Sequence, residues 1–210
     1  KAGRLYSPGL STPENAKMDL SYDAILKSVD SSLKRLSLDK IDILFIHDPE
    51  LHPEGRRSGF KQVMTESFQA AQKLKNDGLI NAIGVGMNEW EMPLKFIKEF
   101  NLDCVLQAGR YTLMNQTALH PFLDECEKRD VSVIIGAPLN GGFICSNMDA
   151  NTIHSYQPEK DRNDPTILLK GNKIKNICNS YNVPIKSAAI QFPFRHPAVA
   201  SIIPGASTSE

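Results

Sequence analysis

Residues 28–49 read SVDSSLKRLSLDKIDILFIHDP, and this stretch joins the two patterns that decide the fold. Its first half belongs to residues 22–36, where apolar side chains recur at the spacing of an amphipathic helix. Its second half contains the short apolar run 41–46, which indicates a strand buried on both faces. The strand cannot continue through Pro49. The stretch therefore predicts a helix, followed by a buried strand that ends at His47.

The same alternation of helices and apolar strands continues along the chain. Further strands are expected at 82–86, 103–107, 131–135 and 199–203, and further helices at 60–76, 91–100, 117–129, 167–181 and 185–194. Polar or glycine-rich loops are expected at 51–59 and 137–163.

This alternation indicates an α/β fold with a parallel sheet covered by helices. An open doubly wound sheet and a (β/α)8 barrel both fit the pattern. No G-x-G-x-x-G motif opens a helix, so the dinucleotide fingerprint of the doubly wound fold is missing. Polar or glycine-rich residues instead follow the C-terminal ends of the strands, where a barrel places its active site. We therefore predict the (β/α)8 barrel.

The composition excludes several classes of protein. The chain has 210 residues, with 24 Lys+Arg and 24 Asp+Glu, so its formal net charge is zero. This balance gives no basic surface for nucleic acid or an anionic membrane, and we expect neither as a partner. No apolar run reaches the roughly 18 residues of a membrane span. The composition leaves the oligomeric state open.

The spacing of the cysteines and histidines indicates the cellular compartment and whether a metal site is expected. The four cysteines form no CxxC pair, which is typical of free thiols in a reducing compartment, and we expect the cytoplasm. The five histidines show no HExxH or other ligand spacing, so no metal site is expected.

His47 and Asp48 are the first candidates for chemistry. A histidine at the end of a barrel strand could donate a hydrogen bond to a carbonyl oxygen, or it could simply bond to a loop. Asp48 could be its partner or only a turn former before Pro49.

Three further segments could contact a ligand. The glycines after Asn140, Gly141-Gly142, would let backbone amides approach a phosphate, although a plain loop has the same composition. The segment Gly205-Ala206-Ser207 follows the last strand, where a helix N-terminus would bind an anion or merely be capped. Arg110 could clamp a ligand or lie over an aromatic ring at the surface.

Four stretches together resemble one family, the aldo-keto reductases. They are 28–49 (quoted above), 83–90 (IGVGMNEW), 108–113 (AGRYTL) and 189–205 (AIQFPFRHPAVASIIPG). Their details are similar to the branch that contains the L-galactose, L-fucose and D-threo-aldose 1-dehydrogenases and pyridoxal 4-dehydrogenase. The resemblance extends over essentially the whole chain.

The resemblance implies an activity. Members of the family are (β/α)8 barrels that bind NAD or NADP without a Rossmann motif. They transfer a hydride between nicotinamide and a carbonyl or lactol carbon, so a small sugar or aldehyde is the expected substrate. They use an Asp-Tyr-Lys-His tetrad for catalysis, in which tyrosine is the acid/base and lysine lowers the tyrosine pKa. His47 matches the family histidine, and Lys1 matches the lysine because Lys1-Ala2-Gly3-Arg4 resembles the family's Thr-Lys-x-Gly-Arg.

The resemblance also implies cofactor contacts, with departures. The family's Ser-Asn pair is Gly86-Met87 here, so the carboxamide role passes to Asn88. Gln107 stands one residue before the family's glutamine, and the tyrosine that stacks on nicotinamide falls at Gly136. NADP-selective relatives carry a lysine where this chain has Gly205-Ala206, which favours NAD. The predicted residues are catalytic Lys1 and His47; cofactor-binding Asn88, Gln107, Asn140, Gly141, Gly142, Gly205, Ala206 and Ser207; and substrate-binding Asp48 and Arg110.

The number of strands gives a further expectation. Five strands are expected, with Lys1 at the end of a sixth, so residues 1–210 are predicted to be one incomplete barrel: strands 4–8 plus the end of strand 3, shortened at both ends. The tetrad aspartate and tyrosine would precede Lys1. A non-catalytic nucleotide-binding barrel with a regulatory or scaffold role is the main alternative. A Schiff-base aldolase would need a buried lysine at a strand end, and Lys1 is its one placed candidate.

Overall fold

The computed structural model describes residues 18–146, 148 and 165–206, so Lys1 and Ser207 lie outside the described residues. Its sheet has five parallel strands in the order β1-β2-β3-β4-β5. The strands are β1 Ile41–His47, β2 Ile80–Met87, β3 Cys104–Ala108, β4 Ser132–Gly136 and β5 Val199–Ile203.

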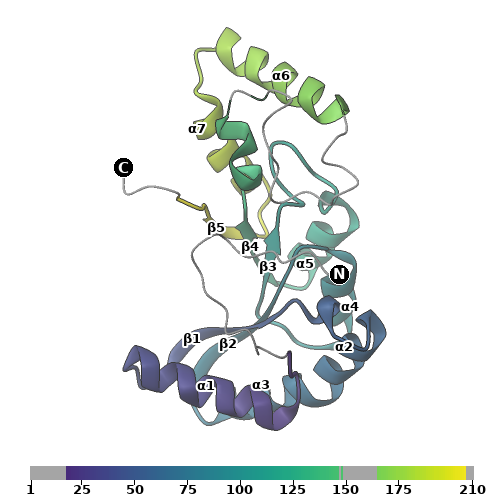
Figure 1. Cartoon of the computed structure of the whole chain (residues 1–210), viewed down its shortest axis with the longest axis vertical. Coiled ribbons are helices and arrows are strands. Elements are labelled where there is room, and N and C mark those ends of the chain that lie inside the picture. The colour runs from purple at the N-terminus through teal and green to yellow at the C-terminus, as the bar shows by residue number, and fades with distance from the viewer. Residues whose placement is uncertain (1–17, 147, 149–164, 207–210) are drawn as a thin grey trace.

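This strand order distinguishes between the two predicted architectures. In a doubly wound sheet the order reverses at a switch point. Here each strand pairs with the one before it, and right-handed crossovers in one direction put the connecting helices on one face. Figure 1 shows a curved sheet with α4 and α5 along one side and the other side uncovered by helices. The sheet is therefore an arc of a barrel wall.

The helices occupy the connections between strands. They are α1 Tyr22–Leu36, α2 Arg56–Gln62, α3 Phe68–Asn76, α4 Glu91–Glu99, α5 Asp124–Lys128, α6 Pro165–Ser180 and α7 Ile185–Gln191. Shorter turns are η1 Pro49–Leu51, η2 Val63–Ser67, η3 Leu119–Leu123, η4 Asn140–Cys145 and η6 Phe192–Arg195.

The core lies between the helices and the covered face of the sheet. Phe68 of α3 stacks on Phe100 with ring centroids 4.0 Å apart and meets Phe96 of α4 edge-on at 5.3 Å. These contacts join neighbouring helices over the outer face of β2. A second, smaller cluster packs α6 and α7 against η4, and so supports the segment that follows β4.

One predicted helix starts earlier than the sequence indicates. The prediction placed residues 51–59 in a loop because Gly55 and Gly59 punctuate them, but α2 begins at Arg56. A Cβ at Gly59 would lie 1.9 Å from the Pro49 carbonyl oxygen. Gly59 is therefore inside a helix because it allows close packing on η1, and not because the chain turns there.

An ion pair closes the N-terminal end of the sheet. The Lys75 ammonium lies 2.6 Å and 2.8 Å from the two carboxylate oxygens of Asp103. The same carboxylate accepts a 2.7 Å hydrogen bond from the Ile83 amide. The end of α3, the middle of β2 and the start of β3 are joined through this one side chain.

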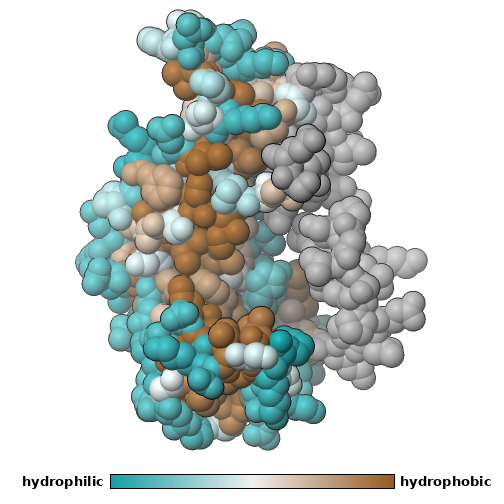
Figure 2. Space-filling view, turned by 90° about the vertical axis from the view of Figure 1, so that its left-hand side faces the viewer, coloured by the Kyte–Doolittle hydropathy of each residue, from teal (hydrophilic) through white to brown (hydrophobic). Residues whose placement is uncertain are grey.

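The face of the sheet opposite the helices is apolar. Figure 2 shows a hydrophobic band running down this side of the molecule. Ile43 of β1 and Ile203 of β5 are 37% and 53% exposed. None of the described helices combines the length and the apolar character needed to cross a membrane.

Candidate functional site

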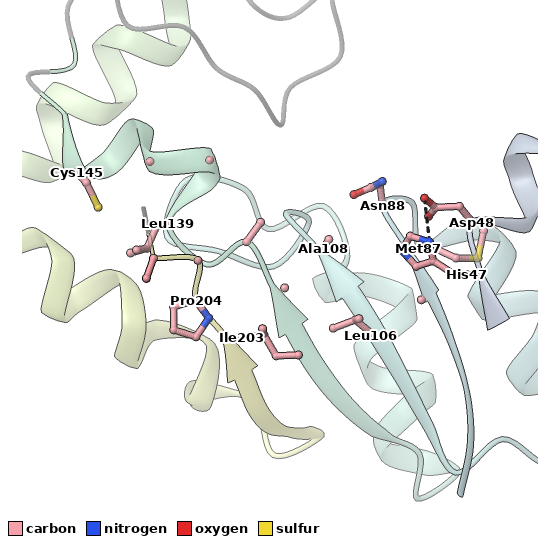
Figure 3. A pocket seen from close by; sticks show the side chains of 17 residues that line it. His47, Asp48, Met87, Asn88, Leu106, Ala108, Leu139, Cys145, Ile203 and Pro204 are labelled. Atoms are coloured by element: carbon pink, nitrogen blue, oxygen red, sulfur yellow. Dashed lines mark ion pairs between the residues drawn. The ribbon is translucent and has the colours of Figure 1, made fainter. Parts of the chain in front are cut away.

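A pocket of about 620 Å³ opens at the C-terminal ends of the strands, within the range of small-molecule sites. Figure 3 shows His47, Asp48 and Asn88 on one side of it and Leu139, Cys145 and Pro204 on the other. Its lining residues are His47, Asp48, Gly86, Met87, Asn88, Leu106, Ala108, Gly136, Ala137, Leu139, Gly141, Gly142, Cys145, Ile203, Pro204, Gly205 and Ala206.

His47 is the last residue of β1, and its side chain is 70% exposed at the pocket wall. Its Nδ1 lies 3.5 Å from Oδ2 of Asp48. Because Nδ1 faces this carboxylate, Nε2 is the ring nitrogen available to a ligand. The strand end thus presents an imidazole whose orientation a neighbouring carboxylate supports.

Asp48 has an unusual conformation and environment. Its backbone is left-handed (φ 47°, ψ 45°), and its amide donates to the Gly86 carbonyl at 2.9 Å. The residue is only 9% exposed, and its buried Oδ1 has no hydrogen-bond partner among the described residues. Burial raises the pKa of this carboxyl, and the nearby His47 opposes the rise. An unsatisfied acceptor in a strained backbone at a pocket wall is typical of a functional position.

Glu50, in the turn η1 that follows Asp48, is a second acidic residue near the pocket wall. Burial, reinforced by the charges of Asp48 and Glu89, raises the pKa of Glu50 to about 7, and Arg56 opposes the rise. Arg56 also pairs with Glu89 at 2.5 Å. Nothing in the sequence beyond the position of Glu50 just after the strand indicated this group.

Small residues form the floor of the pocket. Gly86, Ala108 and Gly136 occupy neighbouring strand ends, where Ala108 is paired with Gly136. A Cβ at Gly86 would lie 3.2 Å from Cδ2 of His47, and one at Gly136 would lie 3.3 Å from Cβ of Ala108. Larger side chains here would fill the space beside the imidazole. The small residues therefore leave the space beside the imidazole open.

The rim after β4 is built from left-handed residues. Asn140, Gly141 and Gly142 have φ values of 52°, 63° and 89°. Asn140 is 7% exposed, and its Oδ1 has no partner among the described residues. Across the pocket, Gly205 has open space around the position of a Cβ. The two rim segments present backbone to the pocket with few side chains in the way.

The structure brings most of the predicted residues together. Those that line the pocket are His47, Asp48, Asn88, Gly141, Gly142, Gly205 and Ala206. Asn140 lies immediately beside Gly141 but outside the lining, and Lys1 and Ser207 are not described.

Besides Asn140, two predicted residues lie outside the pocket lining, Gln107 and Arg110. Gln107 is fully buried and donates from Nε2 to the Met87 carbonyl at 3.2 Å, while its neighbours Leu106 and Ala108 face the pocket. Arg110 donates from Nε to the Asn88 carbonyl at 2.9 Å. Both side chains hold the segment that ends β2.

Part of the pocket lining is apolar. Met87, Leu139 and Cys145 contribute to the wall although no motif marks them. All four cysteines are free thiols, and burial raises the pKa of Cys104 to about 11 and that of Cys126 to about 12. Burial thus favours the protonated form of both thiols over the nucleophilic thiolate. The described residues include no cluster of three metal-ligating side chains.

The family profile of the aldo/keto reductases matches residues 10–210. The chain belongs to the aldo/keto reductase family. It is 34% identical over 195 residues to pyridoxal 4-dehydrogenase from Microbacterium luteolum, covering 91% of this chain and 56% of that protein. It is 30% identical over 225 residues to D-threo-aldose 1-dehydrogenase from a Pseudomonas species, covering 99% and 65%. It is 26% identical over 193 residues to L-galactose dehydrogenase from Arabidopsis thaliana, covering 90% and 56%.

The chain thus spans between 56% and 65% of the length of these three relatives. Solved structures of this family share its fold. The holo form of an aldo-keto reductase from Bacillus halodurans superimposes with a TM-score of 0.68 at 20% identity, covering 91% of this chain and 59% of that one. The glycerol dehydrogenase of Gluconobacter oxydans gives 0.69 at 22% identity, covering 93% and 60%. The predicted barrel architecture and family are confirmed.

Proposed function

We propose that the intact protein is a nicotinamide-dependent oxidoreductase of the aldose 1-dehydrogenase type, which moves a hydride between NAD or NADP and a sugar lactol or aldehyde. The observation that carries this proposal is the position of His47. Its imidazole stands at a strand end, on the wall of a 620 Å³ pocket with a small-residue floor and a glycine-rich rim.

The pocket residues fit a nicotinamide nucleotide. The glycine floor at Gly86 and Gly136 leaves space for a flat ring beside His47, since a Cβ at Gly86 would crowd that side chain. The rim glycines Gly141 and Gly142 allow backbone amides to approach phosphates closely. Asn88 would hold the carboxamide, and Gly205 with Ala206 would line the path of the adenosine half. When bound, such a cofactor supplies or accepts a hydride at nicotinamide C4.

The chain's own residues orient the substrate. His47 would donate from Nε2 to the carbonyl or lactol oxygen, while Asp48 steadies the imidazole through Nδ1. Asp48 places a carboxyl group on this side of the pocket, which suits a substrate that is rich in hydrogen-bond donors. Lys1 is our second proposed catalytic residue, as the lysine that lowers the pKa of a general-acid tyrosine.

The relatives support the substrate class. Two of the similar proteins are named for aldose or galactose oxidation, and a third is named for oxidation of pyridoxal. We propose a preference for NAD, because Gly205 and Ala206 offer no charge to a 2′-phosphate.

A turnover screen of the intact protein tests the proposal. Galactose-, fucose- and arabinose-type aldoses and pyridoxal-type aldehydes would be offered with each cofactor, and nicotinamide absorbance would be followed. Reduction of the cofactor by at least one aldose is the expected result. Cofactor binding without turnover of any compound would contradict the proposal and favour a nucleotide-binding scaffold.

A further inference from the structure

We propose that the outer face of α6 is a docking surface for an acidic protein segment that carries apolar side chains. The centre of this surface, which we call the α6 stripe, consists of Leu169, Lys173, Ile177 and Tyr181. None of these residues lines the pocket, so the inference does not depend on the proposed function.

The α6 stripe is exposed, and three of its four side chains are apolar or aromatic. Its members follow one another at intervals of four residues, so they lie on successive turns of one helix face. Leu169, Ile177 and Tyr181 are 68%, 59% and 77% exposed. Figure 1 shows α6 at one end of the molecule, beyond the sheet. Single apolar side chains are ordinary on a surface, whereas apolar side chains gathered on one face indicate an interaction site.

The fold packs α6 through its opposite face. Ile167, Leu168 and Ile174 pack against the second, smaller hydrophobic cluster. A Cβ at Gly171 would lie 2.8 Å from Sδ of Met148, so this inner face approaches the cluster closely. The helix is therefore anchored without the α6 stripe, and the outer apolar side chains are available to a partner.

Charge is unevenly distributed along the chain, although its formal total is zero. Residues 165–206 contain five Lys or Arg and no Asp or Glu, whereas residues 18–146 contain 14 Lys or Arg and 18 Asp or Glu. Lys170 and Lys173 are exposed, and neither forms an ion pair with a described residue. This basic surface complements an acidic partner, and it would repel a second copy that docked through the same face.

The arrangement of these residues favours a protein partner over an anionic membrane. Helices that lie in a membrane surface carry their apolar and basic residues on separate faces. Here Lys173 stands between Leu169 and Ile177 on one face, and the exposed Asn172 and Asn176 lie beside them. Asparagine amides donate and accept hydrogen bonds, which a protein segment can match group by group.

A hollow of about 340 Å³ lies next to the last residue of the α6 stripe. It is lined by Asn179, Asn182, Val183 and Pro184, and Tyr181 belongs to the same turn of the chain. At protein interfaces, an apolar or aromatic side chain that fills such a hollow contributes a large part of the binding energy. We expect one apolar side chain of the acidic segment to enter it.

The experiment titrates the intact protein with three labelled synthetic peptides of equal length. The first carries glutamates and has leucines along one helix face. The second has serine in place of each leucine, and the third has lysine in place of each glutamate. Fluorescence anisotropy should show that the first peptide binds at least about tenfold more tightly than the others, and that salt weakens its binding. Absence of binding by the first peptide would overturn the proposal.

Charge reversal and removal of the aromatic ring locate the binding. Lys170→Glu combined with Lys173→Glu should weaken binding of the first peptide about tenfold, and Tyr181→Ala should weaken it by a similar factor. The matched control is Lys95→Glu combined with Lys98→Glu, since these exposed lysines of α4 are also three residues apart. The control should bind within about twofold of the unmodified protein. Equal loss in both double variants would overturn the assignment to α6.

Leu169→Ser separates docking from a structural role. It should weaken peptide binding and leave the melting temperature of the intact protein within about 2 °C, because Leu169 is exposed. A much larger fall would show that the intact protein covers the α6 stripe itself, which would overturn the proposal.

Two further measurements distinguish the other occupants. Tighter binding to vesicles of anionic phospholipid than to the first peptide would overturn the proposal in favour of a membrane surface. A dimer of the intact protein that Leu169→Ser abolishes, seen by sedimentation, would overturn it in favour of a second copy.

Discussion

A buried or half-buried carboxylate lies at each end of the sheet, and the two differ in their hydrogen bonds. At the N-terminal end, Asp103 accepts hydrogen bonds from the Lys75 ammonium and the Ile83 amide. At the C-terminal end, Asp48 keeps one buried oxygen without a partner among the described residues. The first carboxylate joins three elements of the fold. The second carboxylate lies at the wall of the pocket.

Left-handed backbone occurs at both ends of the sheet and does not distinguish them. Ser37 and Asp130 precede β1 and β4, and Asp48, Ala137 and Asn140 follow these strands. The difference between the ends lies in the hydrogen bonding of their carboxylates and in the pocket at the C-terminal end. The comparison assigns stability to the N-terminal end and binding to the C-terminal end, as in other barrels. The following predictions test that division, from the largest expected effect to the smallest.

Replacing the imidazole should produce the largest effect. His47→Ala should lower kcat by about 10²–10⁴-fold, the contribution of a positioned acid/base or orienting group. Cofactor affinity should stay within a few-fold, because the ring faces the reacting oxygen. Steady-state kinetics and a fluorescence titration with the cofactor measure the two quantities. His120→Ala, at an exposed histidine paired with Asp124, is the control. A kcat within a few-fold of the unmodified enzyme would show that His47 has another role.

A substitution at the opposite end should affect stability and spare turnover. Asp103→Ala removes the Lys75 pair and the Ile83 hydrogen bond, which together should lower the free energy of unfolding by about 1–3 kcal/mol. Asp77→Ala removes only an exposed pair with Lys73 and should cost about 0.3–0.5 kcal/mol. Denaturant unfolding gives both values, and kcat of the folded fraction should be unchanged. Loss of turnover in folded Asp103→Ala would contradict the assignment of stability to the N-terminal end and binding to the C-terminal end.

The cofactor preference should follow charge at the rim. Gly205 has open space around it, so Gly205→Lys is sterically permitted. The added ammonium should raise the ratio of kcat/KM for NADP over NAD about tenfold, which equals about 1.4 kcal/mol. Gly205→Gln, of similar length and without charge, should leave the ratio near its original value. An equal shift in both variants would exclude a charge effect at this position.

The smallest predicted effect is a pH dependence of stability at Glu50. Its folded pKa of about 7 lies above the ordinary value of 4.5, because of burial and the charges of Asp48 and Glu89. Between these values the folded chain binds more protons than the unfolded chain, so the free energy of unfolding falls as pH rises through this window. Glu50→Gln cannot ionise, so its free energy of unfolding lacks this contribution to the pH dependence.

Melting temperatures measure the Glu50 effect. Relative to the unmodified protein, Glu50→Gln should melt higher above pH 7, and the gain should shrink toward pH 4.5. The exposed Glu54→Gln is the control and should show no such trend. A gain that is independent of pH would mean that Glu50 ionisation is not its source.

Much of the fold could be predicted because it depends on local patterns. The apolar run that ends at His47 predicted both the strand and the position of the imidazole, since strand ends of a barrel meet at one face. Gly59 could not be predicted as helical, because its role depends on the distance to the Pro49 carbonyl. That distance arises from tertiary packing.

Single side chains of the site were harder to predict than strand ends. Gln107 and Ala108 are neighbours in β3, and a difference of one residue decides whether a side chain faces the pocket or the helices. Arg110 lies near the site in sequence, but it bonds to the Asn88 carbonyl. The unpaired oxygen of Asp48 has no sequence signature, because it results from burial.

Hydrogen exchange with and without NAD tests most directly the claim that the C-terminal end of the sheet is the binding end. Amides of the rim segments 137–142 and 205–206 should exchange more slowly when the cofactor is present. Amides of Ile83 and its neighbours around Asp103 should exchange at the same rate in both samples. Protection confined to the rim is the predicted result. Unchanged exchange at the rim under saturating cofactor, or protection centred on the Asp103 end, would contradict the account.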